Sequence, residues 1–203
     1  LDYLERVSGY FKGRRSLVIE FKNSVNEPPY LILKKKYEEA KLLKQDFIEA
    51  ISISSYSPKK NEVDSRYVNL KTVDGHNFIF YTNYNSPKSI QFNEHNQVSV
   101  IIFWSKTNTQ IRIKAHIKKL SDSQSDKHYK SRNKNKNALA ISSNQSMEIS
   151  SYEDMHNNYN EALNSNNLGE RPSYWGGFSF KPYYFEFWTG DDNRINKREA
   201  FLK

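Results

Sequence analysis

Cysteine is absent from the 203-residue chain, and glycine and proline are scarce. Without cysteine there is no disulfide scaffold, no cysteine-ligated zinc or iron–sulfur cluster, and no thiol nucleophile. The longest apolar runs, such as Val100–Trp104, are too short to cross a bilayer as a helix, and no basic segment followed by an apolar one opens the sequence. The five histidines show no metal-ligand spacing. These absences predict a cytoplasmic, globular protein without a membrane span or a bound metal.

Basic residues outnumber acidic ones, with 31 Lys and Arg against 23 Asp and Glu, which leaves a formal charge of +8. A chain of this length buries roughly 70% of the surface that its unfolded form exposes, so one hydrophobic core suffices for stability. A basic domain is suited to nucleic acid, to an anionic membrane surface or to small phosphorylated ligands. The same charge spread over the whole surface would only keep the protein soluble. Composition does not decide among these interpretations.

Alternation of apolar and polar residues, which is typical of half-buried strands, dominates the middle of the chain. It is clearest over Thr109–Leu120, where one face is apolar and the other cationic. Asp74-Gly75 separates two such segments and predicts a hairpin, and Pro182 is expected at the corner of a second one. Strands are expected over Phe47–Ser54, Arg66–Lys71, Phe78–Asn83, Gln97–Trp104, Thr109–Leu120, Tyr174–Lys181 and Tyr183–Thr189.

Helices are expected between these strands, over Pro28–Lys44, Ser86–Glu94, Ser121–Arg132 and Ser150–Leu163. The segment Asn133–Asn137 is basic and has no apolar anchor, so it is interpreted as a flexible loop. Together the elements predict a mainly β fold of the α+β class, an antiparallel sheet that closes as a barrel with peripheral helices. No internal repeat or linker divides the chain, so residues 28–203 are expected to form one domain behind an N-terminal extension of residues 1–27.

Short motifs follow one another along the chain: Arg66–Lys71, Phe80–Asn83 with Ser86-Pro87-Lys88, Gln110–Ile113, Ser131-Arg132, Gln145-Ser146, Tyr174–Phe178, Phe185–Trp188 and Arg194–Arg198. In order and spacing, from Pro28 to Arg198, they resemble the pyridoxamine 5′-phosphate oxidase family. The resemblance implies an FMN-binding split β-barrel over residues 28–203. It also implies a homodimer with two flavins at the subunit interface.

The resemblance assigns a set of FMN contacts. A flavin phosphate requires cations and hydroxyl or amide donors, and the isoalloxazine ring requires hydrogen bonds and an apolar or aromatic wall. Pro87 stands where the family usually has Arg, which removes one phosphate cation. By resemblance, the phosphate and ribityl contacts are Arg66, Lys88, Gln145 and Ser146, the strand along the ring is Arg66, Tyr67, Val68, Asn69, Leu70 and Lys71, and the set is completed by Tyr81, Thr82, Gln110, Trp188 and Arg198.

The substrate side departs further from the family. Lys71 and Arg132 match residues that hold the substrate phosphate in the family, whereas His128 replaces a Tyr and Lys136 a Ser. Both replacements can donate hydrogen bonds to an anion. In the family's Arg-x-His pair, which holds the substrate's ring and reactive carbon, Arg194 is retained and Asn196 replaces the His. The resemblance therefore assigns Arg194 the alignment of the reactive carbon.

The resemblance also implies a reaction. The C4′ amine or alcohol of a phosphorylated pyridine of the vitamin B6 group is oxidised by hydride transfer to flavin N5. Dioxygen then reoxidises the flavin, and the products are pyridoxal 5′-phosphate and hydrogen peroxide. Two alternatives stay open: an oxidase of the same fold with another substrate, as in phenazine pathways, and a protein that binds FMN or pyridoxal phosphate without turnover. Because much of the basic charge falls at the family's ligand positions, no nucleic-acid partner is expected.

Several of these residues also have plain structural interpretations. Trp175 in a strand is expected to be a core aromatic. His128, among charged residues of a helix, is expected to be an exposed polar side chain. Gly176-Gly177 is expected where two strands approach closely, because no helix follows it that could bind a phosphate. The basic run Lys127–Lys136 suits a solvated face, a nucleic-acid backbone or an anion-binding loop over the flavin.

Overall fold

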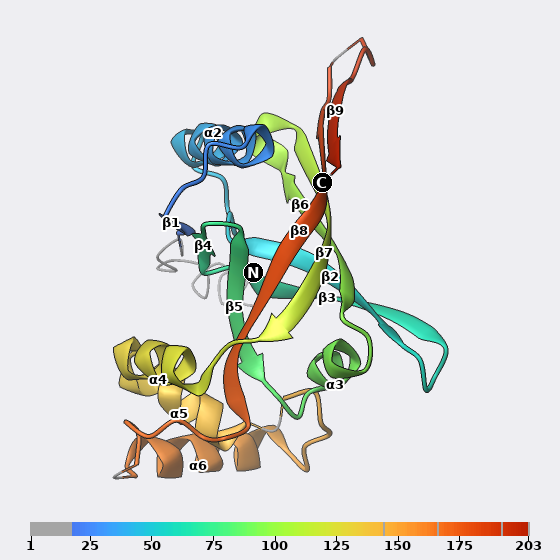
Figure 1. Cartoon of the computed structure of the whole chain (residues 1–203). Helices are drawn as coiled ribbons and strands as arrows, with labels where there is room; N and C mark the ends of the chain where they lie inside the picture. The colour runs from blue at the N-terminus through green and yellow to red at the C-terminus, as the bar shows by residue number, and fades with distance from the viewer. Residues whose placement is uncertain (1–17, 144, 166, 192, 203) are drawn as a thin grey trace, which may run out of the picture.

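The computed structural model describes residues 18–143, 145–165, 167–191 and 193–202, and a β-sheet forms most of it (Figure 1). The strands are β1 Glu20–Lys22, β2 Ala50–Ser57, β3 Glu62–Asn69, β4 Thr72–Asp74, β5 Asn77–Asn83, β6 Gln97–Trp104, β7 Thr109–Lys119, β8 Trp175–Thr189 and β9 Lys197–Leu202. They are paired in the order β1-β4-β5-β8-β7-β6-β2-β3, and β9 pairs with β8. Residues 1–17 of the expected N-terminal extension lie outside the described residues, while β1 adds a strand that runs parallel to β4.

Strands β6 and β7 show why the sheet forms where the sequence alternates. Every second residue of β6 is buried and the residues between are exposed, and most of β7 repeats this pattern. Val100 lies opposite Ile113, and both side chains are fully buried. Burying one such side chain stabilises the fold by roughly 1.5–3 kcal/mol. The strands predicted over Gln97–Trp104 and Thr109–Leu120 are confirmed.

Strand β8 runs without interruption from Trp175 to Thr189, so the hairpin predicted at Pro182 is wrong. Its first part pairs with β5, its last part pairs with β9, and β7 follows it along most of its length. The register shifts between Lys114 and Ala115, which lie opposite Tyr184 and Pro182. This irregularity accommodates a proline, which has no N–H to donate to a neighbouring strand.

The turn predicted at Asp74-Gly75 is confirmed, and Gly75 adopts a φ of 55°, which favours glycine. Its strands differ from the prediction, however. The segment Arg66–Lys71 belongs mainly to β3, which pairs with β2, and the short strand β4 is the partner of β5. The hydrogen-bonded path through the described strands therefore runs open from β1 to β3. The expected closure of the sheet is wrong, whereas the mainly β architecture with peripheral helices is confirmed.

Helices lie at both ends of the sheet (Figure 1). Helix α4 begins with a capping box between Ser121 and Gln124. Helix α5 occupies the segment predicted as a flexible loop, and that prediction is wrong. The side chain of Asn133 caps α5 by accepting a hydrogen bond from the Lys136 N–H at 2.9 Å. The helices are α2 Pro28–Leu42, α3 Pro87–Glu94, α4 Asp122–Ser131, α5 Lys134–Ser142 and α6 Tyr152–Leu163, with a 3₁₀ turn η1 at Ser105–Thr107.

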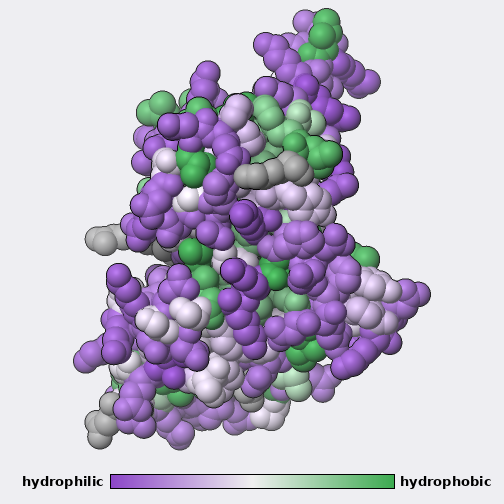
Figure 2. All heavy atoms as spheres, viewed as in Figure 1, coloured by the Kyte–Doolittle hydropathy of each residue, from purple (hydrophilic) through white to green (hydrophobic). Residues whose placement is uncertain are grey.

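Aromatic rings pack together with aliphatic side chains in the core. The rings of Phe78 and Phe180 lie 5.1 Å apart on the paired strands β5 and β8, and both are fully buried. On the outside, the face seen in Figure 2 is mostly hydrophilic, with hydrophobic residues gathered in small patches. Within the described part of the chain, no helix is both long and apolar enough to cross a membrane.

Candidate functional site

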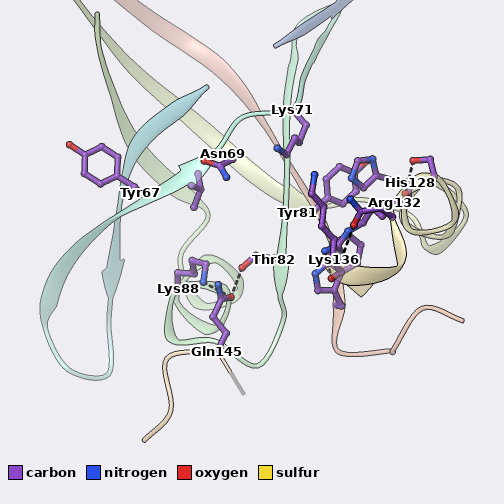
Figure 3. Close-up of a pocket in the computed structure, with 14 residues that line it drawn as sticks. Tyr67, Asn69, Lys71, Tyr81, Thr82, Lys88, His128, Arg132, Lys136 and Gln145 are labelled. Carbon is purple, nitrogen blue, oxygen red and sulfur yellow. Dashed lines mark hydrogen bonds between the residues drawn. The ribbon is translucent and has the colours of Figure 1, made fainter. Parts of the chain in front are cut away.

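A cavity of about 620 Å³ opens between strands β3 and β5 and helices α3, α4 and α5 (Figure 3). Its volume lies in the range typical of small-molecule sites, roughly 300–1,000 Å³. Cationic side chains line it, and no carboxylate occurs among the described residues of its wall. An anionic ligand fits such a cavity. The lining residues are Tyr67, Val68, Asn69, Lys71, Tyr81, Thr82, Lys88, His128, Ser131, Arg132, Asn133, Lys136, Gln145 and Trp175.

Lys88, Thr82 and Gln145 form a hydrogen-bonded group on one side of the cavity (Figure 3). The Oε1 atom of Gln145 accepts hydrogen bonds from Lys88 Nζ at 2.9 Å and from Thr82 Oγ1 at 2.8 Å. Lys88 Nζ also donates to Ser86 Oγ at 3.0 Å. Burial, together with the nearby charge of Arg66, lowers the pKa of Lys88 to about 8. A cation and a hydroxyl group therefore lie side by side, as a phosphate group requires.

Lys71, Arg132 and Lys136 bring three cationic side chains to another side of the same cavity (Figure 3). Burial lowers the pKa of Lys71, and the charges of Lys136 and Arg132 lower it further, while the charge of Glu49 opposes this shift. Arg132 Nη2 donates to the carbonyl oxygen of Lys136 at 2.7 Å. Arg132 Nη1 is buried and has no hydrogen-bond partner in the described part of the chain. A buried donor without a partner costs about 1–3 kcal/mol, so an anionic acceptor here would stabilise the site.

Three rings stack against one another in the cavity wall. The ring centroids of Tyr81 and His128 are 3.6 Å apart with an interplanar angle of 6°, and those of Tyr81 and Trp175 are 5.5 Å apart at 8°. The guanidinium carbon of Arg132 lies 4.2 Å from the Trp175 ring. His128 is half-buried, so the expectation of an exposed side chain is wrong. Trp175 is buried as expected, and it also lines the cavity.

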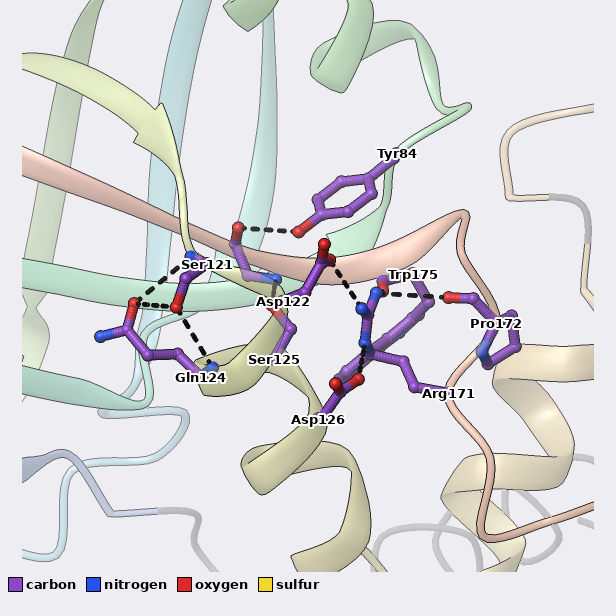
Figure 4. A network of polar contacts seen from close by, with 10 residues as sticks. Tyr84, Ser121, Asp122, Gln124, Ser125, Asp126, Arg171, Pro172 and Trp175 are labelled. Carbon is purple, nitrogen blue, oxygen red and sulfur yellow. Dashed lines mark hydrogen bonds and ion pairs between the residues drawn. The ribbon is translucent and has the colours of Figure 1, made fainter.

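Arg171 joins helix α4 to the start of β8 (Figure 4). Its Nε lies 2.5 Å from Asp126 Oδ1, its Nη2 lies 2.7 Å from Asp122 Oδ1, and its Nη1 donates to the Trp175 carbonyl oxygen at 2.7 Å. The Arg171 side chain is only 8% exposed. These contacts fix the helix that carries His128 against the strand that carries Trp175.

The glycine pair after Trp175 allows α4 and β5 to approach β8 closely. A Cβ at Gly176 would overlap the Tyr84 hydroxyl group, and a Cβ at Gly177 would overlap the Leu120 side chain. The Gly177 N–H donates to Ser125 Oγ of α4 at 3.2 Å. The expected close approach at this pair is therefore confirmed, because a Cβ at either position would displace these neighbours.

Most of the predicted site residues meet in the cavity. The predicted cofactor contacts that line it are Tyr67, Val68, Asn69, Lys71, Tyr81, Thr82, Lys88 and Gln145, and the predicted substrate contacts that line it are Lys71, His128, Arg132 and Lys136. Other predicted contacts lie nearby but outside its wall. Arg66 donates to Ser55 Oγ at 2.6 Å and to Gln91 Oε1 at 2.8 Å, Leu70 is in the core, and Ser146 is exposed.

The remaining predicted contacts lie on strands away from this cavity. Gln110 of β7 lies opposite Trp188 of β8, which in turn lies opposite Arg198 of β9. Arg194 and Asn196 are exposed in the connection between β8 and β9. In Figure 1, β9 projects from the end of the molecule opposite to α4, α5 and α6. The structure of one chain therefore divides the predicted site into two groups.

Three lining residues were not predicted as site residues: Ser131, Asn133 and Trp175. Ser131 and Asn133 flank Arg132 at the junction of α4 and α5. The only sequence signal that could have indicated them as site residues is that they are adjacent to Arg132. The sequence indicated that Trp175 is buried. Sequence alone does not distinguish a ring in the core from a ring that lines a cavity.

Comparisons with known sequences agree with this geometry. Residues 28–159 match the family model described as pyridoxamine 5′-phosphate oxidase. The chain is 36% identical to pyridoxine/pyridoxamine 5′-phosphate oxidase 1 of Hydrogenovibrio crunogenus over 158 residues, which span 76% of this chain and 71% of that protein. It is 37% identical to the pyridoxine/pyridoxamine 5′-phosphate oxidase of Legionella pneumophila over 148 residues, which span 71% of this chain and 68% of that protein.

Solved structures show the same fold. PhzG from Burkholderia lata, in complex with tetrahydrophenazine-1-carboxylic acid, superposes with a TM-score of 0.79 at 25% identity over 86% of each chain. A pyridoxamine 5′-phosphate oxidase-related, FMN-binding protein from Nostoc punctiforme superposes with a TM-score of 0.66 at 10% identity, over 87% of this chain and 98% of that one. The second likeness concerns the fold alone. By motifs, matched length and fold, the chain belongs to the pyridoxamine 5′-phosphate oxidase family, whose members are FMN-dependent oxidoreductases.

Proposed function

We propose that the chain is an FMN-dependent oxidase that acts on a small phosphorylated ring, namely pyridoxamine or pyridoxine 5′-phosphate. The observation that carries the proposal is the cavity of about 620 Å³, whose described wall contains Lys71, Lys88, Arg132 and Lys136 but no carboxylate. Cations on two sides of one cavity fit two phosphate groups, one from the cofactor and one from the substrate. Membership of the family supports FMN as the cofactor.

The side of the cavity at Lys88 fits the phosphate and ribityl groups of FMN. Lys88 Nζ and Thr82 Oγ1 both reach Gln145, so a cation, a hydroxyl and an amide are presented together. The charge of Arg66 contributes to the lowered pKa of Lys88, which places two cations close to one another. A phosphate dianion would offset that repulsion. Strand β3, whose residues Tyr67–Asn69 line the cavity, would then lie along the flavin ring.

The other side fits the phosphate of the substrate. Arg132 offers a buried Nη1 donor without a partner among the described residues, and Lys71 and Lys136 add charge. The stacked rings of Tyr81 and His128 form a flat surface beside these cations. Together they would hold the phosphate, exclude water and fix the plane of a bound ring, which is how a protein brings a substrate carbon to reacting distance.

We further propose that a second copy of the chain completes the site. The outer face of the sheet exposes Tyr67 by 78%, Ile101 by 41% and Phe103 by 54%. Exposed aromatic and apolar side chains on one face are typical of an interface between chains. Tyr67 also lines the cavity, and Phe103 lies opposite Gln110 on β7, so the face extends from the cavity rim toward the second group of predicted contacts.

A second copy on this face would bring Gln110, Trp188 and Arg198 of one chain toward the cavity of the other. Arg194 and Asn196 lie in the same region, because their connection leads into β9. In such a dimer Arg194 would align the reactive carbon of the substrate. FMN, when bound, would supply the two-electron acceptor for oxidation at substrate C4′, with dioxygen as the final acceptor that becomes hydrogen peroxide. An alcohol would give the aldehyde directly, whereas an amine would give an imine that water hydrolyses to the aldehyde and ammonia.

Absorbance measurements test the cofactor and the substrate separately. Purified protein should take up FMN with a flavin spectrum, and anaerobic addition of pyridoxamine or pyridoxine 5′-phosphate should bleach it. The variant Arg132→Met should keep the spectrum and lose the bleaching at low substrate concentration. Protein that fails to take up added FMN would contradict the cofactor proposal, and elution as a monomer with FMN bound would contradict the dimer.

The likeness to PhzG, at a TM-score of 0.79, supports a second candidate function on the same fold. His128, Lys136 and Asn196 depart from the residues that the family usually has, and all three concern the substrate. Anaerobic bleaching by a reduced phenazine carboxylate, without bleaching by either vitamin B6 phosphate, would establish this alternative. FMN uptake that none of these donors bleaches, while dithionite does, would instead establish a binding protein without turnover.

A further inference from the structure

His128 lies on the side of the cavity that the proposed substrate anion would occupy. Its ring is 3.6 Å from the Tyr81 ring at an interplanar angle of 6°. Tyr81 covers one face of the imidazole and fixes its plane, and His128 lines the cavity, so its ring nitrogen atoms are the groups that can bond to an anion there. His128 is thus available as a hydrogen-bond partner for an anion in the cavity.

Cationic groups surround His128 from several elements. Burial is the main cause that lowers its pKa to about 4, and the charges of Arg132, Lys71, Lys136 and Lys22 contribute in that order. These four residues come from the end of α4, the connection after β3, helix α5 and strand β1. The imidazole is therefore neutral near pH 7 when no ligand is bound.

No carboxylate lines the cavity wall within the described residues, although the charge of Glu49, outside the wall, acts on Lys71. The two acidic residues of helix α4, Asp122 and Asp126, are both paired with Arg171 (Figure 4). Arg171 offsets only one of these two charges, but neither carboxylate lines the cavity. An anion bound in the cavity would supply the negative charge that His128 lacks around it.

We propose that His128 takes up a proton from solvent when a doubly charged anion enters the cavity, so that the site selects a dianionic group such as a phosphate monoester over a singly charged carboxylate. The inference rests on the substrate side of the proposed function and not on FMN. A dianion offsets the repulsion from Arg132, Lys71 and Lys136, which makes an imidazolium stable in the complex. The imidazolium then donates a charge-assisted hydrogen bond to the anion. A monoanion has less charge with which to stabilise it.

The direction of the pH dependence follows from these charges. Without ligand, His128 stays neutral down to about pH 4. With a dianion bound, its pKa returns toward the ordinary value of about 6.5. Affinity for the dianion therefore rises as the pH falls from about 7.5 to 5, by about tenfold or more. Lys88, whose pKa is lowered to about 8, changes its charge mainly above this range.

Sulfate is a suitable probe because it carries two charges throughout this range. Calorimetric titration at pH 7.5 and pH 5, in two buffers of different ionisation enthalpy, measures both affinity and proton uptake. Wild-type protein should bind sulfate about tenfold more tightly at pH 5 and take up protons on binding. The side chains introduced by His128→Gln and His128→Tyr do not titrate in this range, so the sulfate affinity of these variants should change by less than about twofold between the two pH values. Benzoate, a monoanion, should show a weaker pH dependence with wild-type protein.

The control variant is His156→Gln, on helix α6 and outside the cavity wall, which should keep the wild-type pH dependence. Equal sulfate affinity at both pH values, no sulfate binding at all, or a pH dependence that persists in both His128 variants would overturn the inference. Melting curves show whether each variant is folded. Protein that fails to take up FMN but shows proton-linked sulfate binding would contradict the cofactor proposal and would support the proposal for His128.

Discussion

The two sides of the cavity contain similar side chains in different surroundings. Lys88 is only 6% exposed, and its ammonium group donates to Ser86 and Gln145 before any ligand is present. Arg132 shares the cavity wall with Lys71 and Lys136, and one of its buried donors has no partner in the described part of the chain. The first side is thus organised by the protein itself, whereas the second is organised fully only by a bound anion. Under the proposed function, the first side retains the cofactor and the second recognises the substrate.

The largest expected effect comes from removing the donor at the substrate side. Arg132→Met should weaken binding of pyridoxal 5′-phosphate about 10- to 100-fold, because a hydrogen bond to a charged group contributes about 1.5–3 kcal/mol. FMN affinity should change by less than about threefold. Fluorescence and absorbance titrations measure the affinities for FMN and for pyridoxal 5′-phosphate separately. Lys127→Met, which removes an exposed cation of the same helix, is the control, and an equal loss of both ligands in Arg132→Met would abolish the distinction between the two sides.

The next effect concerns Lys88 and depends on pH. Lys88→Met should weaken FMN binding about tenfold at pH 7, because a charge-assisted contact to the phosphate is lost. In wild-type protein FMN affinity should also fall as the pH rises above about 8, where Lys88 loses its proton in the free protein. Quenching of FMN fluorescence between pH 7 and 9 measures the affinity of the variant and the pH dependence of the wild-type affinity. A fall of the same size in Lys88→Met would show that another group is responsible.

Arg171 sharpens the comparison because its contacts hold α4 and Trp175, which belong to the substrate side of the cavity. Arg171→Met should lower the free energy of unfolding by about 1–3 kcal/mol, because it leaves the buried carbonyl of Trp175 without its donor. For a chain of this size the melting temperature should fall by several degrees. Anion affinity should fall more than FMN affinity, since α4 carries His128. Lys41→Met, which breaks an exposed pair with Glu38, is the control and should cost less than about 0.5 kcal/mol.

The smallest expected effect comes from Tyr81, which links the stacked rings. Tyr81→Phe keeps the ring against His128 and should leave sulfate affinity at pH 5 within about twofold. Tyr81→Leu removes an aromatic contact of about 0.5–1.5 kcal/mol and should weaken sulfate binding about threefold. Calorimetric titration distinguishes the two variants. Equal affinities would mean that the stack does not position His128.

Local pattern was sufficient to predict much of the sheet. The strand over Gln97–Trp104 was predicted with the bounds that the structure shows, because every second residue enters the core. The hairpin at Pro182 could not be rejected from sequence, because the register shift opposite Lys114 and Ala115 is what tolerates the proline. Helix α5 was missed for a related reason. Its buried Asn137 donates to the carbonyl oxygen of Leu168 at 2.9 Å, a contact between segments far apart in the sequence.

The site could be predicted as a set of residues but not as an arrangement. The motifs indicated Lys88, Gln145 and Trp188 alike as site residues. In the structure, Lys88 and Gln145 are hydrogen-bonded to each other, whereas Trp188 lies on β8 away from them. The departure at His128 was visible in the sequence. Its stacking on Tyr81 and its neighbouring cations depend on four separate elements, so its neutral state could be found only in three dimensions.

The position of strand β8 in the sequence affects the order in which the sheet can fold during synthesis. It lies late in the chain, yet it pairs with both β5 and β7 and carries Trp175 into the cavity wall. During synthesis, β5 and β7 therefore expose unpaired edges until β8 leaves the ribosome. Pairing of segments so distant in sequence is a slow step. Because Trp175 of β8 forms part of the cavity wall, the cavity is complete only after β8 has paired, and a ligand of the cavity stabilises that completed sheet.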